Sequence, residues 1–325
     1  MKKRASVLLF CVLFLLPILL SCSKKEPGKA ADKSIRVVTT LFPLYDFARN
    51  VGGNNVSVEL LLPPGMEPHS FEPKPGDIRK MNEADIFIFT GGFMEPWVED
   101  VLKGISNDNL LVVDTSMGIL PEEDSDRSEY HHVHGKAGGR NGHHHEPGAI
   151  DPHIWLDFSH AQTMVENILN GFIAKDPGRT AEYMKNAGAY ASRLSALDKR
   201  FREALTSCRK DVIIHGGHFA FGYLARRYHL KHLSAVSGFS PNAEPSPKDI
   251  IALIRTLKNN RVRYVFFEEL VAPNVAETIS RETGAQLLML HGAHNVSKKD
   301  WDQGVTFISL MEENLKNLKT GLECQ

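Results

Sequence analysis

Short apolar runs alternate with helical patterns through the first part of the chain. The runs are rich in β-branched and aromatic residues, which favours strands, and they fall at residues 35–40, 56–62, 85–89 and 110–113. Helical patterns lie between them, at residues 43–53, 75–84 and 96–105. Because these strands are apolar along nearly their whole length, their order predicts a parallel sheet with helices on both faces.

The second part repeats this alternation after one long helical stripe. From Arg179 to Leu205 apolar residues recur every three or four positions, and Pro177-Gly178 marks the start of the helix. An ordinary surface helix would also give such a stripe, but no helix breaker interrupts this one. Strands then follow at residues 211–214, 232–236, 264–267 and 286–290, with helices at 221–228, 246–259, 274–282 and 305–322. The pattern predicts an α/β fold: two small parallel-sheet α/β lobes joined by one long rigid helix, with a cleft between them.

The first 21 residues have the pattern of an export signal. A basic start at residues 2–4 precedes an apolar run from Val7 to Leu20, which is too short to span a bilayer comfortably. Residues 19–22, Leu-Leu-Ser-Cys, resemble a bacterial lipobox, and that resemblance implies cleavage before Cys22 and acylation of its thiol. An uncleaved anchor is the alternative, but a polar linker follows at once. We expect a chain that is exported and lipid-anchored on the outer side of the cytoplasmic membrane or in the periplasm.

These segments give the expected domain organisation. The five parts are a signal peptide at 1–21, a linker at 22–34, an N-terminal α/β lobe at 35–177, a connecting backbone helix at 178–207 and a C-terminal α/β lobe at 208–325. A histidine-rich loop, residues 122–150, is inserted in the first lobe.

Charge and cysteine content refine this picture. The formal net charge of −1 gives no sign of nucleic-acid binding. Loss of residues 1–21 removes three basic and no acidic residues, so 35 − 39 gives −4 for the mature chain. Cys11 leaves with the signal, so Cys208 and Cys324 remain as an even pair in a compartment where disulfides persist. Either they form a bridge that pins the C-terminus, or they are two unpaired buried thiols.

A histidine-rich tract follows the fourth predicted strand. Six of the fifteen histidines lie within residues 131–145, after an acidic run at 122–126. Neutral imidazole is a common ligand for zinc, copper and nickel, and short histidine-rich tracts are typical of metal collection. The alternatives are an inert solvated linker and an expression tag, but a tag would lie at a terminus. The tract predicts auxiliary, low-affinity metal binding by His131, His132, His134, His143, His144 and His145.

Histidines also gather where predicted strands end. Ligands of open α/β sheets bind beyond the carboxyl ends of the strands, and each lobe places histidines there. Three or four neutral imidazoles suit zinc better than manganese or calcium, which prefer more oxygen ligands. The histidines in these positions are His69, His153, His215, His218, His291 and His294.

Three motifs at these positions resemble a known family. They are Pro-Pro-Gly-Met-Glu-Pro-His-Ser-Phe-Glu-Pro at 63–73, Asp-Pro-His-Ile-Trp-Leu-Asp at 151–157 and His-Phe-Ala-Phe-Gly-Tyr-Leu at 218–224. They are similar to the metal-binding lipoproteins of bacterial ABC importers, the TroA-like cluster A-I solute-binding proteins, and within them to the zinc-specific ZnuA-like branch. The resemblance covers nearly the whole mature chain. It implies two helix-linked α/β lobes with the metal between them.

The resemblance also implies a ligand set. Carried over by position, His69 and His153 are ligands from the first lobe and His218 is a ligand from the second. Relatives often have an aspartate just after the last strand, where this chain has His291. We take His291 as the fourth ligand, while His294, Glu67, Glu268 and water remain alternatives. Three further histidines are assigned to the surface or to local hydrogen bonds: His215, His229 and His232.

The implied function is capture of Zn²⁺ outside the cytoplasm and its delivery to an ABC permease and the ATPase of that permease. We expect a monomer that is not an enzyme. A manganese- or iron-binding or adhesin-type lipoprotein of the same fold is an alternative, although a carboxylate in place of His218 would have favoured manganese. A zinc hydrolase is another, and Glu268-Glu269 could supply its base. The chain has no His-Glu-x-x-His motif and no nucleophile elbow, which disfavours a hydrolase.

Overall fold

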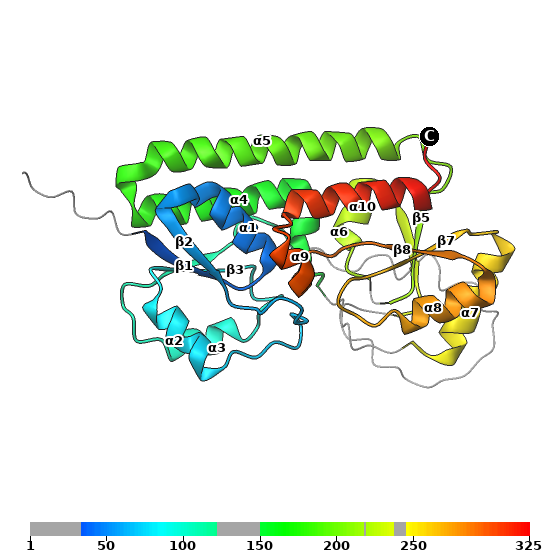
Figure 1. Ribbon diagram of the computed structural model, residues 1–325, viewed down its shortest axis with the longest axis horizontal. Helices are drawn as coiled ribbons and strands as arrows, with labels where there is room; N and C mark the ends of the chain where they lie inside the picture. The colour runs from blue at the N-terminus through cyan, green and yellow to red at the C-terminus, as the bar shows by residue number, and fades with distance from the viewer. Residues whose placement is uncertain (1–33, 122–149, 218, 237–244) are drawn as a thin grey trace, which may run out of the picture. The chain divides into compact units, whose positions relative to one another are not determined.

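The first lobe is built on a parallel four-stranded sheet. The computed structural model describes residues 34–121, 150–217, 219–236 and 245–325. In this lobe the strand order is β2-β1-β3-β4, and β1, β2 and β3 are labelled in Figure 1. The strands are β1 (Ile35–Thr39), β2 (Val56–Leu60), β3 (Ile86–Phe89) and β4 (Leu111–Asp114). The order reverses between β1 and β3, which is where ligands of such sheets bind.

Helices cover both faces of this sheet because its strands are apolar on both sides. Val37, Ile86 and Ile88 belong to the core shared with α1 and α4. Their neighbours Val38 and Phe87 instead pack in a separate core with α2 and α3. The helices are α1 (Phe42–Gly52), α2 (Pro75–Glu83), α3 (Val98–Lys103) and α4 (Phe158–Lys175).

The second lobe has the same plan. Its sheet is also parallel, in the order β6-β5-β7-β8. The strands are β5 (Val212–His215), β6 (Lys231–Ser234), β7 (Tyr264–Phe267) and β8 (Gln286–Met289). The helices are α6 (Gly222–Arg227), α7 (Pro247–Asn259), α8 (Asn274–Thr283), α9 (Lys298–Asp302) and α10 (Phe307–Gly321). Two parallel-sheet lobes confirm the predicted fold class.

The predicted long helix is α5 (Thr180–Leu205), and it packs against α1, α4 and α10 (Figure 1). Short 3-10 helices lie at η1 (Gly53–Asn55), η4 (Ile154–Leu156) and η5 (Pro177–Arg179), the last directly before α5. The buried side chains of α5 follow the predicted stripe: Tyr183, Ala187, Tyr190, Leu194, Leu197, Phe201 and Leu205. The helix therefore joins the two lobes along a continuous apolar seam.

The sequence patterns predict no element at residues 158–175, where the structure has α4. Asp157 caps this helix by accepting hydrogen bonds from the backbone N–H groups of Ser159 and His160. Phe158, the first residue of α4, and Phe172 are both fully buried. The short helix α9 is a further element that the patterns do not predict.

The predicted disulfide is present between Cys208 and Cys324, which are 116 residues apart. It joins the end of the α5 segment to the C-terminus. Within the part of the chain that the structure describes, no helix is both long and apolar enough to cross a membrane. The predicted signal peptide, lipid-bearing Cys22 and most of the histidine-rich loop lie outside the described residues, and the predicted domain boundaries remain predictions.

Candidate metal centre

His69 lies in the loop that follows β2. The Glu67 carboxylate accepts hydrogen bonds from the backbone N–H of His69 and of Ser70, each at 3.0 Å, and so holds the turn that carries the imidazole. Earlier in the same loop, Gly65 has a φ of 87°, a conformation that favours glycine, and its N–H donates to Val296 of the second lobe at 2.8 Å. This loop is therefore shaped by its own carboxylate and by the other lobe.

His153 lies in the segment that enters η4, and its side chain is fully buried. Oδ1 of Asp151 is 2.8 Å from His153 Nδ1 and accepts a hydrogen bond from the His153 backbone N–H at 3.0 Å. An imidazole held through Nδ1 offers Nε2 to a metal. The orientation of the His153 ring is therefore fixed by the protein itself, without a metal.

His294 lies in the loop after β8, and this loop packs onto the first lobe. The His294 carbonyl accepts from the Phe42 N–H at 3.0 Å, and the Asn295 side-chain amide donates to the Pro63 carbonyl at 2.7 Å. The Trp155 indole N–H donates to the Gly292 carbonyl at 2.8 Å. A Cβ at Gly292 would lie 2.4 Å from the His294 ring, so this close turn requires glycine.

These three segments bring His69, His153 and His294 into one group. One ligand atom from each lies within 4.8 Å of the others, and Nε2 of His69 is 3.3 Å from Nε2 of His153. Tetrahedral zinc with nitrogens at about 2.0–2.1 Å spaces those nitrogens roughly 3.4 Å apart. The two imidazoles therefore already stand at a separation that one zinc ion would require.

Two buried carboxyls after β7 form a second group with His294. Oε1 of Glu268 and Oε1 of Glu269 lie 3.5 Å and 3.6 Å from His294 Nδ1. Burial holds the pKa of Glu268 well above its usual range; the His294 charge opposes this shift and Glu269 adds to it. Burial also acts on Glu269, but the His291 charge and hydrogen bonds outweigh it and lower the pKa of that carboxyl.

His291, the predicted fourth ligand, belongs to neither group. Its Nδ1 is 3.1 Å from Glu269 Oε1, and its backbone N–H donates to Asn314 Oδ1 at 2.7 Å. Burial lowers the pKa of His291, but the charge of Glu269 outweighs that effect and raises it. The prediction that His291 binds metal remains untested. The histidine that joins His69 and His153 is instead His294, three residues later in the loop after β8.

Of the other histidines named from the sequence, three lie among the described residues and the rest do not. His215 is buried, and its Nδ1 accepts from the Gly217 N–H at 3.2 Å. His232 stacks on Phe219 with ring centroids 3.9 Å apart, and His229 is exposed. Outside the described residues lie His218, His131, His132, His134, His143, His144 and His145.

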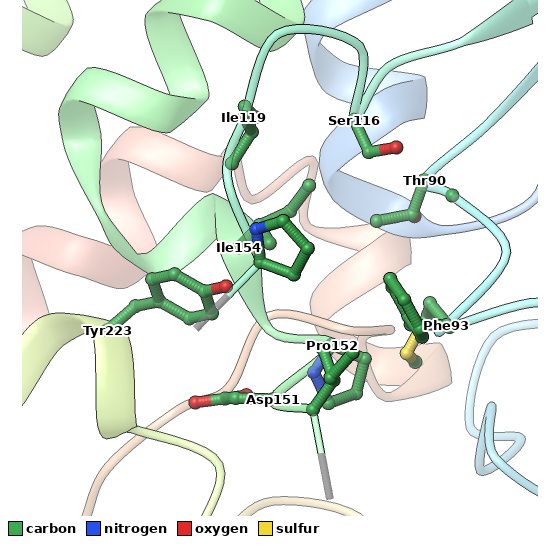
Figure 2. A pocket seen from close by; sticks show the side chains of 12 residues that line it. Thr90, Phe93, Ser116, Ile119, Asp151, Pro152, Ile154 and Tyr223 are labelled. Atoms are coloured by element: carbon green, nitrogen blue, oxygen red, sulfur yellow. The ribbon is translucent and has the colours of Figure 1, made fainter. Parts of the chain in front are cut away.

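A small cavity of about 60 Å³ is lined by Asp151, Pro152 and Ile154, the residues on either side of His153 in the chain (Figure 2). Its walls come mainly from the first lobe, with Tyr223 of α6 on the opposite side. Asp151 lines it, and the Asp151 carboxyl points toward the side on which Tyr223 lies (Figure 2). Pro121 and Ile150, the residues that flank the undescribed segment 122–149, line it as well.

The chain is similar in sequence to known proteins. The family model described as "ZnuA: Zinc-uptake complex component A periplasmic" matches residues 37–321. The zinc-binding lipoprotein AdcA of Streptococcus pneumoniae serotype 4 is 36% identical over 321 residues, 98% of this chain. The high-affinity zinc uptake system protein ZnuA of Bacillus subtilis strain 168 is 34% identical, over 99% of this chain and 98% of its own length.

The chain spans only 60% of the length of the AdcA relative. Among solved structures, the Zn(II)-bound ZnuA-like domain of Streptococcus pneumoniae AdcA has a TM-score of 0.74 and 31% identity. That match covers 90% of this chain and all of the AdcA domain. The similarity thus includes both lobes.

Proposed function

This chain belongs to the family of ZnuA zinc-uptake components, and from that premise we propose that it captures Zn²⁺ outside the cytoplasm and delivers it to an ABC permease. The observation that carries the proposal is the convergence of His69, His153 and His294 from both lobes, with ligand atoms within 4.8 Å. The zinc ion is the cargo and is not consumed by any reaction.

The proposed ligands are His69, His153 and His294, with His218 as the fourth. His218 is proposed from its motif alone, and His294 replaces His291 because only His294 lies in the three-histidine group. Four neutral imidazoles are a nitrogen-rich set that suits zinc, whereas manganese and calcium favour oxygen ligands. Because both lobes supply ligands, one ion would join them.

The histidine-rich segment is proposed as a low-affinity collector. The two residues that flank it, Pro121 and Ile150, line the same cavity as Asp151, the partner of His153. Zinc held weakly by the tract would therefore be released close to the tight site. The tract's six histidines raise the local zinc concentration in this scheme, while the ligands of the centre set the affinity.

Delivery requires partners and a location that we also propose. The chain would act as a monomer, anchored by lipid on Cys22, with a membrane permease and a cytoplasmic ATPase as its partners. The lipobox-like residues 19–22 and the lipoprotein nature of the AdcA relative support the anchor. Membership of a zinc-uptake family supports a solute-binding role over an enzymatic one.

The test is a calorimetric zinc titration of the soluble chain without residues 1–22. We compare it with a chain that also lacks residues 122–148 and with His153→Ala. We expect one tight site that survives the deletion, loss of weak sites on deletion, and loss of the tight site in His153→Ala. The exposed His229→Ala serves as the matched control and should bind as the unaltered chain does. Tight binding that disappears with the segment would mean that the protein is a histidine-tract metal buffer.

A further inference from the structure

We propose that Asp151 is a positioning residue that couples the two lobes through the metal centre. One oxygen of its carboxylate orients His153 of the first lobe, and the other faces the second-lobe helix that follows His218. The inference rests on the proposed zinc-capture function and gives Asp151 a role in positioning the proposed ligand His153 and helix α6.

The first oxygen, Oδ1, fixes both the backbone and the ring of His153. It accepts from the His153 N–H at 3.0 Å and lies 2.8 Å from Nδ1, and neither side chain is exposed to solvent. A proton on Nδ1 that bonds to this carboxylate leaves Nε2 as the ligand atom. That Nε2 is the atom 3.3 Å from Nε2 of His69. Carboxylate partners of this kind raise the basicity of a metal-binding imidazole.

The second oxygen, Oδ2, faces helix α6 of the other lobe. Arg226 Nη2 lies 3.8 Å from it, and a Cβ at Gly222 would lie only 2.4 Å from it. No side chain larger than hydrogen fits at Gly222 without moving the helix or the carboxylate. Figure 2 shows the carboxyl pointing to the side of the cavity where Tyr223 of α6 lies. The Arg226 guanidinium carbon also lies 4.8 Å from the centre of the Tyr223 ring, so both side chains belong to the same α6 surface.

Helix α6 is also the element that follows the proposed second-lobe ligand. Its first residue, Gly222, is four positions after His218 in the loop from β5. Asp151 would thus act directly on the proposed ligand His153 and, in the second lobe, on the position of α6.

The negative Asp151 carboxylate lies between two positive groups, the Arg226 guanidinium on one side and, beyond His153, the zinc ion on the other. Metal binding and the contact between the lobes would therefore support each other. The order is the Arg226 guanidinium, the Asp151 carboxylate, the neutral His153 ring and the zinc cation. In a buried setting these attractions are weakly screened by solvent. Losing the carboxylate charge would weaken both the ligand basicity of His153 and the hold on α6.

The experiment measures zinc affinity by competition with a chelator, and the melting temperature of the metal-free protein, for three single variants and for the double variant Asp151→Asn with Arg226→Gln. Asp151→Asn keeps the shape but removes the charge, and Arg226→Gln removes the partner cation. Gly222→Ala adds one methyl group against Oδ2. Gly188→Ala, in α5, is the matched control because a Cβ there meets nothing within 4 Å.

We expect Asp151→Asn to weaken zinc binding by about 10–100-fold, the usual effect of losing such a partner. Gly222→Ala should weaken it although every proposed ligand is intact, and Gly188→Ala should not. The Asp151→Asn and Arg226→Gln losses should combine to less than their product, because both act on one contact. The metal-free melting temperature of Asp151→Asn should fall no further than that of Arg226→Gln, because both variants lose the same contact with α6. The cobalt(II) absorption spectrum of Asp151→Asn should change in shape, since the geometry of His153 changes.

Zinc affinities within twofold of the unaltered chain in Asp151→Asn and Gly222→Ala would overturn the inference. So would a large drop in the metal-free melting temperature of Asp151→Asn with an unchanged cobalt spectrum, which is the signature of a purely structural role. If Asp151→Asn does not fold, Arg226→Gln and Gly222→Ala decide the matter on the same criteria. Failure of the unaltered chain to bind zinc tightly would contradict the proposed function itself, and is seen before any variant is compared.

Discussion

Two of the three grouped histidines present Nδ1 to a carboxyl group. His153 faces Asp151 at 2.8 Å, and His294 faces Glu268 at 3.5 Å. A ring held in this way is limited in rotation, so its other nitrogen is directed toward the centre before metal binds. At the residue scale the site is therefore preorganised by buried acids that are not themselves members of the three-histidine group.

The identity of the ligand from the loop after β8 gives the first prediction. His294→Ala should weaken zinc binding more than about 100-fold, because loss of a direct ligand exceeds the loss of an outer-shell partner. His291→Ala should change it less than about fivefold, because His291 pairs with Glu269 instead. Chelator competition on the purified variants measures both. The reverse order of effects would mean that His291, and not His294, is the ligand from this loop.

Glu95 gives a second prediction, on stability against pH. It is buried near the carboxyl ends of β1 and β3, where it accepts hydrogen bonds from Thr40 Oγ1 at 2.6 Å and from the Gly91 N–H at 3.1 Å. Burial raises the pKa of Glu95 to about 7, although the hydrogen bonds from Thr40, Thr90 and Gly91 oppose the shift. The folded state therefore holds this proton more tightly than the unfolded chain.

The stabilisation from protonated Glu95 is fully present below the ordinary carboxyl pKa near 4.5 and is lost as pH rises through about 7. The free energy of unfolding should fall by roughly 3 kcal/mol over that window on account of this group. In Glu95→Gln that decline should be absent. Urea denaturation of the metal-free protein at pH 5 and pH 8 compares the two, and equal slopes against pH would contradict the prediction.

At the scale of elements, the loop after β8 joins the lobes. It carries His294 from the second sheet yet makes its backbone contacts with the first lobe, through Phe42, Pro63 and Trp155. A loop bonded at both ends has few conformations available, which lowers the entropy lost when a metal binds. The disulfide plays a comparable part at the far end of α5.

The disulfide gives the third prediction. The double variant Cys208→Ser with Cys324→Ser should lose about 4 kcal/mol of unfolding free energy, because the bridge closes a loop of 116 residues in the unfolded chain. Zinc affinity should be unchanged, since the bridge lies at the C-terminal end and not at the metal centre. Urea denaturation and chelator competition measure the two quantities. A large loss of affinity would show that the bridge also shapes the site.

At the scale of the molecule, α5 provides one seam for both lobes. It packs against α1 and α4 of the first lobe and against α10, whose residues also contact β7 and β8. Its seven buried side chains include Tyr190 and Phe201, and Tyr190 donates to the buried Asp46 carboxyl at 2.6 Å. Opening the lobes widely would expose part of this seam, at about 25 cal/mol for each Å² of apolar surface.

The fourth prediction is that zinc causes tilting of the lobes without wide closure. Crystal structures of the metal-free and zinc-bound protein should superpose with only a small change in lobe orientation. Small-angle scattering in solution should give nearly equal radii of gyration for the two states. A large rotation between the crystal structures would contradict the stiff-helix account.

The sequence by itself determined the elements whose residues carry a local period. The strands at 35–39, 86–89 and 264–267 are apolar runs, and α5 is one uninterrupted stripe, so burial follows directly from spacing. Family motifs at His69 and His153 likewise identify candidate ligands without coordinates. Cysteine parity left two alternatives for Cys208 and Cys324, a bridge or two unpaired thiols, and the structure contains the bridge.

Only the tertiary structure shows that His294, and not His291, belongs to the three-histidine group. His291 and His294 both follow β8. A loop sequence has no hydrophobic periodicity from which to predict which side chain points toward the other lobe. Bonds between residues more than 200 positions apart, such as Asn295 to Pro63, decide that direction. The same holds for Asp151 and Gly222, whose close approach depends on how the two lobes pack against each other. Short-range pattern thus specifies the elements, and long-range packing specifies which side chains share a site.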